Sequence, residues 1–349
     1  MRLGLNLGYW GMGNDSDNLV LAKEADRLDY GVVWAAEAYG SDAATVLAYL
    51  AGQTNNIDLG SAVFQIPGRT PANTAMTAAT LDTLSNGRFR LGLGVSGPQV
   101  SEGWHGVRFA KPLKRTREYT EIVRTALRRE RLKYDGEFFT LPLPDGPGKS
   151  LTLTVHPVRE YIPMYLAAVG PKNLELAGEM FDGWLALFFQ PETSQNLRDT
   201  VLAGRQKAGK TLDGFDISPT VPVVIGDDVQ ECAKAVAAYC ALYIGGMGSR
   251  EKNFYNALAT RMGYGEAAAQ IQDLYLARDY QGAAEAVPFE FIDKTSLIGP
   301  RDRIKDRLAA YAEAGVGTLN VATYSPSVDD RIHVVRTMAE VIDEAGLSE

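Results

Sequence analysis

The sequence predicts an α/β fold, a closed (β/α)8 TIM barrel with a helical insertion after the seventh strand. Three observations carry this prediction. Short apolar runs alternate with longer amphipathic stretches at the spacing of about 30 residues that is typical of βα units. Eight such units fit into 349 residues, a length that suits one large barrel. Gly and Asn close several of the helices, as in Ser85-Asn86-Gly87, and a strand follows each time.

The predicted strands are short and mostly apolar, as buried strands are. They are Arg2–Leu7, Gly31–Ala36, Ile57–Phe64, Arg88–Val95, Leu151–Val155 running into Met164–Ala168, Gly183–Phe188, Asp216–Val224 and Thr318–Ala322. Amphipathic patterns predict helices between them, over Asp17–Leu28, Ala72–Leu84, Arg115–Leu127, Asn173–Met180 and Arg301–Ala314.

Residues 1–349 are expected to form one domain. Two regions are longer than a simple (β/α)8 barrel requires and are interpreted as insertions. Residues 128–162, approximately, are rich in Pro and Gly and indicate a surface excursion. Residues 226–295, approximately, are mostly helical and rich in aromatic side chains. Because the loops after barrel strands lie on the catalytic face, this insertion is expected to cover the active site and select the substrate. Alternatively, its aromatic residues only pack its own core; they are Tyr239, Tyr243, Phe254, Tyr255, Tyr264, Tyr275 and Tyr280.

Composition excludes several classes of protein. Hydrophobic residues make up 46% and charged residues 22%, as in soluble globular enzymes. A net charge of −8 and a pI near 5.1 argue against a nucleic-acid partner. No run approaches the roughly 18 apolar residues of a membrane span, and the N-terminus does not resemble a signal peptide, so a cytoplasmic location is expected. Cys232 and Cys240 lie in a helical run without a nearby histidine, which excludes a disulfide framework and a metal site.

Two glycine-containing segments suggest ligand contacts. Gly92, Gly94 and Gly97 match the pattern of a dinucleotide loop, but they lie at the fourth strand and not the first, and no apolar helical period comes after them. Instead, Gly92 and Gly94 are expected to let a flat ligand approach the strand end. The segment Ala168-Val169-Gly170-Pro171-Lys172 joins a strand to a helix, which predicts an anion site at the helix N-terminus. The alternative is an ordinary turn with a surface lysine.

Polar residues at the strand ends are candidates for catalysis. Glu37 and Tyr39 follow the second strand, Asn6 ends the first, and His105 lies near the mouth after the fourth. Burial would suit Glu37 to hydrogen bonding or proton transfer, whereas the structural alternative is an ion pair with an arginine. His156 precedes the fifth strand and is a weaker candidate. Because the chain offers few nucleophiles and acids, a cofactor is expected to carry the chemistry.

Five segments resemble the luciferase-like monooxygenase superfamily. Together they are similar to its actinobacterial branch that uses coenzyme F420. The segments are Val33–Gly40, Leu59–Pro71, Leu81–Phe89, Gly92–Gln99 and Ala168–Lys172.

The resemblance implies a barrel, usually a homodimer, that binds a flavin or deazaflavin at the C-terminal ends of the strands. It places a non-prolyl cis peptide at Ala62–Val63 and a phosphate loop at 168–171, and it makes Arg69 and Lys172 contacts for an acidic oligoglutamate tail. Catalytic candidates are Glu37, Tyr39 and His105. The cofactor-binding candidates are Asn6, Glu37, Ala62, Val63, Phe64, Arg69, Gly94, Val95, Ser96, Ala168, Val169, Gly170, Pro171 and Lys172.

The chain departs from one branch of that family. Its sugar-phosphate dehydrogenases carry an Asp-His pair where this chain has Glu37 and Ala38, and their glutamate after the fourth strand has no counterpart here. The resemblance therefore favours an F420-dependent reductase that adds hydride to an activated C=C or C=N bond of a small organic molecule or a modified peptide. The alternatives are an FMNH2-dependent monooxygenase on the same fold and a non-catalytic scaffold.

Overall fold

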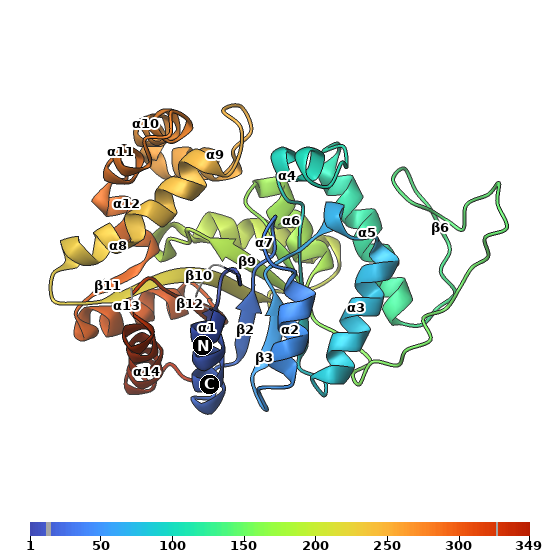
Figure 1. Ribbon diagram of the computed structural model, residues 1–349, viewed down its shortest axis with the longest axis horizontal. Helices are drawn as coiled ribbons and strands as arrows, with labels where there is room; N and C mark the ends of the chain where they lie inside the picture. Colours follow the sequence, from blue (N-terminus) through green and yellow to red (C-terminus); the bar gives the residue numbers. More distant parts are fainter. Residues whose placement is uncertain (12–14, 326) are drawn as a thin grey trace.

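A closed barrel of parallel strands forms the centre of the computed structural model, which describes residues 1–11, 15–325 and 327–349 (Figure 1). Each barrel strand pairs in parallel with the next, and the last pairs with the first, for example Leu5 with Val321. The predicted barrel is thus confirmed. Its strands are β1 (Arg2–Asn6), β2 (Val32–Ala35), β3 (Asp58–Ser61), β5 (Phe89–Gly94), β8 (Met164–Ala167), β9 (Gly183–Leu187), β10 (Asp216–Ile225) and β12 (Thr318–Thr323).

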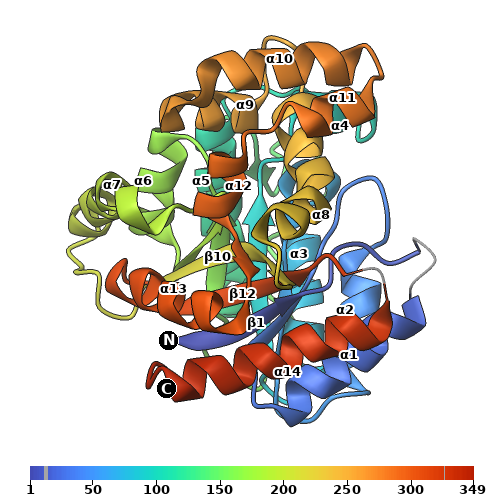
Figure 2. The same cartoon turned by 90° about the vertical axis from the view of Figure 1, so that its left-hand side faces the viewer.

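Helices surround the barrel on its outside (Figures 1 and 2). Some of these helices begin with a side-chain cap: Asp42 accepts a hydrogen bond from the Thr45 N–H (2.8 Å), and Thr70 accepts one from the Asn73 N–H (3.2 Å). No helix in the described ranges is both long and apolar enough to cross a membrane. The outer helices are α1 (Asp15–Arg27), α2 (Ala43–Ala51), α3 (Pro71–Leu84), α5 (Pro112–Leu127), α6 (Pro171–Met180), α7 (Gln195–Lys207), α13 (Arg301–Glu313) and α14 (Val328–Glu344).

The third predicted strand is interrupted. β3 ends at Ser61, the Ala62–Val63 peptide is cis as the resemblance implied, and Phe64–Gln65 form a separate short strand, β4, that pairs with β5. The interruption places Ala62 and Val63 at the C-terminal end of the barrel, where the resemblance implies that a cofactor binds.

The excursion at 128–162 projects from the barrel as a two-stranded hairpin of β6 (Tyr134–Asp135) and β7 (Thr140–Leu141) (Figure 1). The strand predicted over Leu151–Val155 is wrong, because this segment has no strand conformation. Its alternating pattern suits a strand, but it lies outside the barrel and the Leu151 carbonyl accepts only from Leu132. Without a neighbouring strand the pattern cannot form a ladder.

The helical insertion lies between β10 and a short strand, β11 (Leu297–Gly299), that pairs with β10 (Val223 with Leu297). Its helices occupy one end of the barrel (Figure 2), which confirms the predicted insertion after the seventh strand. Its small hydrophobic core is separate from that of the barrel. The helices are α8 (Val229–Ala241), α9 (Phe254–Ala259), α10 (Gly265–Leu276), α11 (Tyr280–Glu285) and α12 (Phe289–Thr295).

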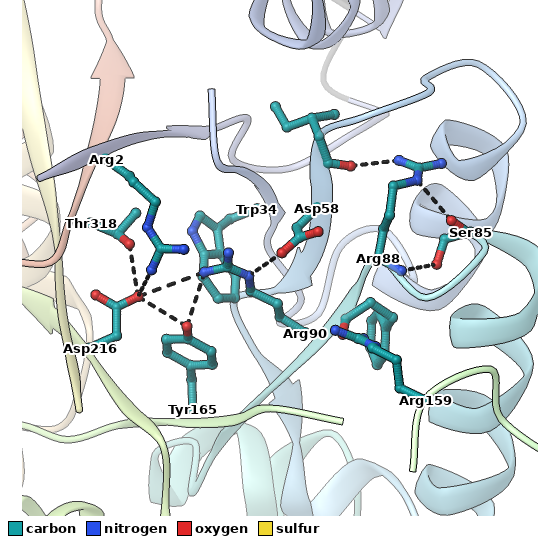
Figure 3. Close-up of polar contacts among 12 residues, drawn as sticks. Arg2, Trp34, Asp58, Ser85, Arg88, Arg90, Arg159, Tyr165, Asp216 and Thr318 are labelled. Carbon is teal, nitrogen blue, oxygen red and sulfur yellow. Dashed lines mark hydrogen bonds and ion pairs between the residues drawn. The ribbon is translucent and has the colours of Figure 1, made fainter. Parts of the chain in front are cut away.

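A buried ionic network joins the strands near the opposite, N-terminal end of the barrel (Figure 3). The Arg90 guanidinium donates to Asp58 Oδ2 (2.7 Å) and to the Tyr165 hydroxyl (3.0 Å), and it lies 3.7 Å from Asp216 Oδ2. Asp216 also accepts from Tyr165 (3.0 Å) and Thr318 (2.8 Å). Because Arg90 is only 6% exposed, its charge depends on these two carboxylates for stabilisation.

Asp26, near the end of α1, fixes the chain that enters β3. Its carboxylate accepts hydrogen bonds from the backbone N–H groups of Asn55 (2.9 Å), Asn56 (2.8 Å) and Ile57 (2.7 Å). Burial alone would raise the pKa of Asp26, but these N–H groups and nearby Arg88 outweigh it, so the pKa lies below its ordinary value.

We expect Asp26→Asn to lower the free energy of unfolding by about 2 kcal/mol at pH 7, because the ionised acceptor of three hydrogen bonds is lost. A carboxylate whose pKa is lowered by folding stabilises the protein above its unfolded pKa, and this contribution disappears as the pH falls through the folded pKa. The difference between wild type and variant should therefore be constant from about pH 5 to 8 and shrink below about pH 4. Urea unfolding at several pH values measures it; a constant difference down to pH 3 would contradict the assignment.

Candidate functional site

The insertion lies across the C-terminal ends of the barrel strands (Figure 2). The ring of Phe254 in α9 packs on Phe109, in the loop after β5, with centroids 6.2 Å apart. Arg261 Nη2 donates to the Val169 carbonyl, after β8, over 3.0 Å. Tyr239 of α8 contacts Tyr324, after β12, with centroids 5.1 Å apart. The insertion thus covers the barrel end that the sequence predicted to be catalytic.

A group of tyrosines gathers around Phe188, which follows β9 with a left-handed φ of 52°. The Phe188 ring lies 5.7 Å from Tyr239 and 5.9 Å from Tyr243, and Tyr243 lies 4.8 Å from Tyr255. These tyrosines pack in the core of the insertion and also contact residues at the strand ends, and their part in selecting the substrate stays a prediction. We define the tyrosine cluster as Tyr9, Tyr239, Tyr243, Tyr255 and Tyr324.

The tyrosine cluster is electrically neutral. Burial, aided by neighbouring phenols, raises the pKa of Tyr239 and Tyr243 well above the ordinary value, and it raises that of Tyr255 to about 12. The groups that act on these three phenols are other tyrosines and, for Tyr239, the Cys240 thiol. The phenols therefore stay protonated at neutral pH and are available as hydrogen-bond donors.

Glu37 adopts the structural arrangement that the sequence left open. Its Oε2 accepts from Arg69 Nη2 (2.9 Å) and from the Ala43 N–H (3.1 Å). Arg69 also pairs with Asp42 and stacks 4.4 Å above the Phe64 ring. Two carboxylates thus offset the charge of Arg69, and this guanidinium is not a free cation for the acidic tail that the resemblance assigned to it.

The other two catalytic candidates lie apart from Glu37's hydrogen bonds. Tyr39 is 65% exposed, and it lies close enough to Tyr9 to contribute, after burial, to raising the pKa of the Tyr9 phenol. His105 packs against Gly68, where an added Cβ would lie 2.8 Å from its ring. Its Nε2 is buried without a partner in the described part of the chain. No hydrogen bond joins Glu37, Tyr39 and His105 within residues 1–11, 15–325 and 327–349.

Asn6 and Ser96 are held by side chains that sequence reasoning did not single out. Asn6 donates to Thr220 Oγ1 (3.2 Å) and accepts from the Gly8 N–H (2.8 Å). Ser96, with a φ of 60°, donates to Gln65 Oε1 (3.0 Å). Gln65 in turn donates to the Ala38 carbonyl (2.6 Å) and so connects the ends of β2 and β5. The feature of the sequence that could have drawn attention to Gln65 is its position immediately after Phe64, a predicted cofactor-binding residue.

The glycines of β5 make room for the protein itself. A Cβ at Gly92 would lie 1.9 Å from the Ser61 carbonyl, and one at Gly94 would lie 2.4 Å from Val63 Cγ2. The contact with a flat ligand that the sequence suggests for these two glycines stays a prediction. The sequence shows no helical period after Gly97, but the structure has a short helix there, α4 (Pro98–Gly103). It follows the fourth barrel strand and is too short for a dinucleotide fold.

The predicted anion loop has the geometry expected of it. Pro171 begins α6, Gly170 caps it, and a Cβ at Gly170 would meet no atom within 4 Å. Lys172 is exposed and forms no ion pair within the described ranges. Asn173 Oδ1 is buried without a partner there. The N-terminus of the helix therefore offers backbone donors, a cation and a free acceptor at one place.

These groups fit the chain of a flavin or deazaflavin. Its ribityl hydroxyls can donate to Asn173 Oδ1, and its phosphate is an anion of the kind that Lys172 and the N-terminus of α6 attract. Ala62, Val63 and Phe64, with Gly94 and Val95, stand at the strand ends where the resemblance expects the ring. Ala168 is held by Trp184, whose Nε1 donates to its carbonyl (2.8 Å). The cofactor contacts themselves remain predictions.

Comparison with known proteins agrees with this geometry. Residues 12–318 match the model of the luciferase-like monooxygenase family. An oxidoreductase of Mycobacterium tuberculosis, named as dependent on coenzyme F420, is 42% identical over 330 residues, which are 93% of this chain and 95% of that protein.

Two solved structures share the fold. The F420-dependent tetrahydromethanopterin reductase of Methanopyrus kandleri superposes with a TM-score of 0.83 at 22% identity, covering 98% of both chains. The oxygenating component of 3,6-diketocamphane monooxygenase from Pseudomonas putida, in complex with FMN, has a TM-score of 0.71 at 20% identity, covering 99% of this chain and 98% of that one.

Proposed function

Because this chain belongs to the luciferase-like monooxygenase family, we propose that it is a coenzyme F420-dependent oxidoreductase. It transfers a hydride between the cofactor and a small organic or peptide substrate. The observation that carries the proposal is the anion loop at 168–172, where an unpaired lysine and a helix N-terminus stand beside a free acceptor. The relative in M. tuberculosis that is named for F420 supports this choice of cofactor.

The chain's own residues bind and orient the reactants. Lys172 and the N-terminus of α6 bind the phosphate, and the partly exposed Ala62 and Val63 form the surface against which the ring rests. When bound, the deazaflavin supplies or accepts a hydride at C5. The insertion excludes water from the barrel mouth through its contacts with Phe109 and Val169.

The tyrosine cluster favours an activated C=C or C=N bond in a largely apolar substrate. Its phenols are neutral, and the main groups that act on Tyr239 and Tyr243 are other phenols and the Cys240 thiol, so they suit an uncharged, conjugated group rather than a sugar phosphate. Reduction of such a bond requires one proton besides the hydride. Both oxygens of Glu37 already accept hydrogen bonds, so a phenol of the cluster or water is the better proton donor.

A reduced-FMN monooxygenase is the second candidate. The anion loop would serve the phosphate of FMN as well as that of F420, and the diketocamphane enzyme carries FMN on the same fold. The two candidates differ in their need for O2, since the deazaflavin reductase requires none.

Side-by-side fluorescence titrations with coenzyme F420 and FMN test the proposal. We expect F420 to bind at least tenfold more tightly than FMN, a difference of about 1.4 kcal/mol. Anaerobic stopped-flow oxidation of reduced F420 by a panel of C=C and C=N acceptors then identifies the substrate class. Preference for FMN with O2-dependent turnover would establish the monooxygenase, and binding of neither cofactor would establish a scaffold.

We also propose a homodimer. Tyr49 on α2 and Met76 and Leu84 on α3 are large apolar side chains about half exposed to solvent, and these two helices pack side by side. An apolar face of this kind is typical of a subunit interface. Sedimentation velocity of the purified chain distinguishes a dimer from the 37.9 kDa monomer.

A further inference from the structure

We propose that Arg261 of the insertion binds the phosphate of the cofactor together with Lys172, and so couples cofactor binding to the position of the insertion. This inference rests on the proposed function, because it concerns the same anion loop. It adds a residue to which neither the sequence motifs nor the family resemblance assigned a role.

Arg261 already lies at the loop. Its Nη2 donates to the Val169 carbonyl over 3.0 Å, although the two residues are 92 positions apart in sequence. Val169 directly precedes Gly170, the residue that caps α6 and has open space around it. One of the five guanidinium N–H groups is thus used at the edge of the anion site, and the bond uses no carboxylate.

The charge of Arg261 is not compensated by the protein. No carboxylate pairs with it in the described ranges, whereas Arg250 of the same insertion pairs with Asp273. Arg261 is exposed, and the part of it that is buried lowers the pKa of its guanidinium. Lys172, which lacks a carboxylate partner as well, stands three residues after Val169. A phosphate is the anion that two such cations and a helix N-terminus would bind together.

The backbone around Arg261 is built to place it there. Arg261 lies in the short segment Thr260–Tyr264 that joins α9 to α10, where the chain is kinked at Gly263, with a left-handed φ of 96°. The kink turns the chain between the two helices, and Arg261 stands at the end of α9 that faces Val169. Because α9 carries Phe254 and the cluster residue Tyr255, a ligand that holds Arg261 also holds the substrate-facing part of the insertion.

Fluorescence titration of two deazaflavins tests the proposal. One keeps the phosphodiester but lacks glutamates, and the other is the phosphate-free deazariboflavin. We expect Arg261→Gln to weaken binding of the phosphodiester form about tenfold, the effect of losing one charge-assisted hydrogen bond, and that of the phosphate-free form less than twofold. Arg261→Lys should recover most of the loss. Arg278→Gln, which removes an exposed arginine from the turn after α10, is the matched control and should change neither affinity.

Hydrogen exchange provides a readout independent of activity. The phosphodiester form should slow amide exchange in residues 254–264 of the wild type, and it should not do so in Arg261→Gln. Equal affinities of wild type and Arg261→Gln for the phosphodiester form would overturn the proposal, as would an equal loss for both deazaflavins. If the wild type binds neither deazaflavin, the proposed function fails instead, and the same comparison with FMN and riboflavin tests Arg261 separately.

Discussion

Arg90→Met is expected to lower the free energy of unfolding by about 3–5 kcal/mol, the cost of leaving buried charges without their partner. Asp216 is 8% exposed and lies on a different strand from Asp58, and Arg90 is the cation between them (Figure 3). Methionine fills a similar volume but donates no hydrogen bond. Asp58 would then lose its 2.7 Å partner, and Tyr165 would lose a donor. Urea unfolding at pH 7, followed by circular dichroism, measures the loss.

Two further variants show whether the charge causes this effect. Arg27→Met removes an arginine that is 61% exposed and paired with Glu24 on α1, and it should cost less than about 1 kcal/mol. Adding Asp216→Asn to Arg90→Met should restore part of the stability, because the buried Asp216, left with only the Arg2 guanidinium at 3.9 Å as its cation, is then neutral. If Arg90→Met were as stable as the wild type, the network would not hold the strands together.

Gly94→Ala is expected to weaken cofactor binding by about 10- to 100-fold, the equivalent of the 1–3 kcal/mol that overpacking costs. The added Cβ would lie 2.4 Å from Val63 Cγ2 and must displace Val63 from the end of the barrel. In the proposed site, Val63 forms the surface that supports the cofactor ring. Titration with F420 measures the change, and Gly103→Ala, where an added Cβ meets no atom within 4 Å, is the matched control.

Val63→Ala should rescue the Gly94 variant. Alanine lacks the Cγ2 atom that the new Cβ meets, so the double variant should bind the cofactor as tightly as Val63→Ala alone. Such non-additivity is the signature of a direct contact. Additive losses from the two substitutions would mean instead that Gly94 contacts the cofactor itself, which was the original prediction for this glycine.

The barrel could be predicted because its signals are local. Apolar runs, helix periods and Gly caps recur along the chain, and each depends on neighbouring residues only. The segment Leu151–Val155 shows where this reasoning ends: its alternation is typical of a strand, but a strand also needs a neighbour, and none lies beside it. The interruption of the third strand after Ser61 came from the family resemblance, since no local signal marks it.

The site was predictable only in part for the same reason. The anion loop is a contiguous motif, and its sequence indicated its geometry directly. The ion pair of Glu37 with Arg69 joins residues 32 positions apart, so the sequence could name the alternative without choosing it. The tyrosine cluster and Arg261 depend on how the insertion folds back over distant strand ends, and a single sequence contains no pattern for that.

Because β10 pairs with β11, the insertion between them can be replaced by another segment without moving the strands. The chain leaves β10 at Ile225 and returns at Leu297, which pairs with Val223, two residues before Ile225. The two ends of the insertion are thus held on neighbouring strands, about 4.8 Å apart, whatever lies between them. A replacement segment would pay little additional loop-closure entropy, because its ends are already held together. Evolution or a protein engineer can therefore graft a new cap onto this barrel without redesigning the strands beneath it.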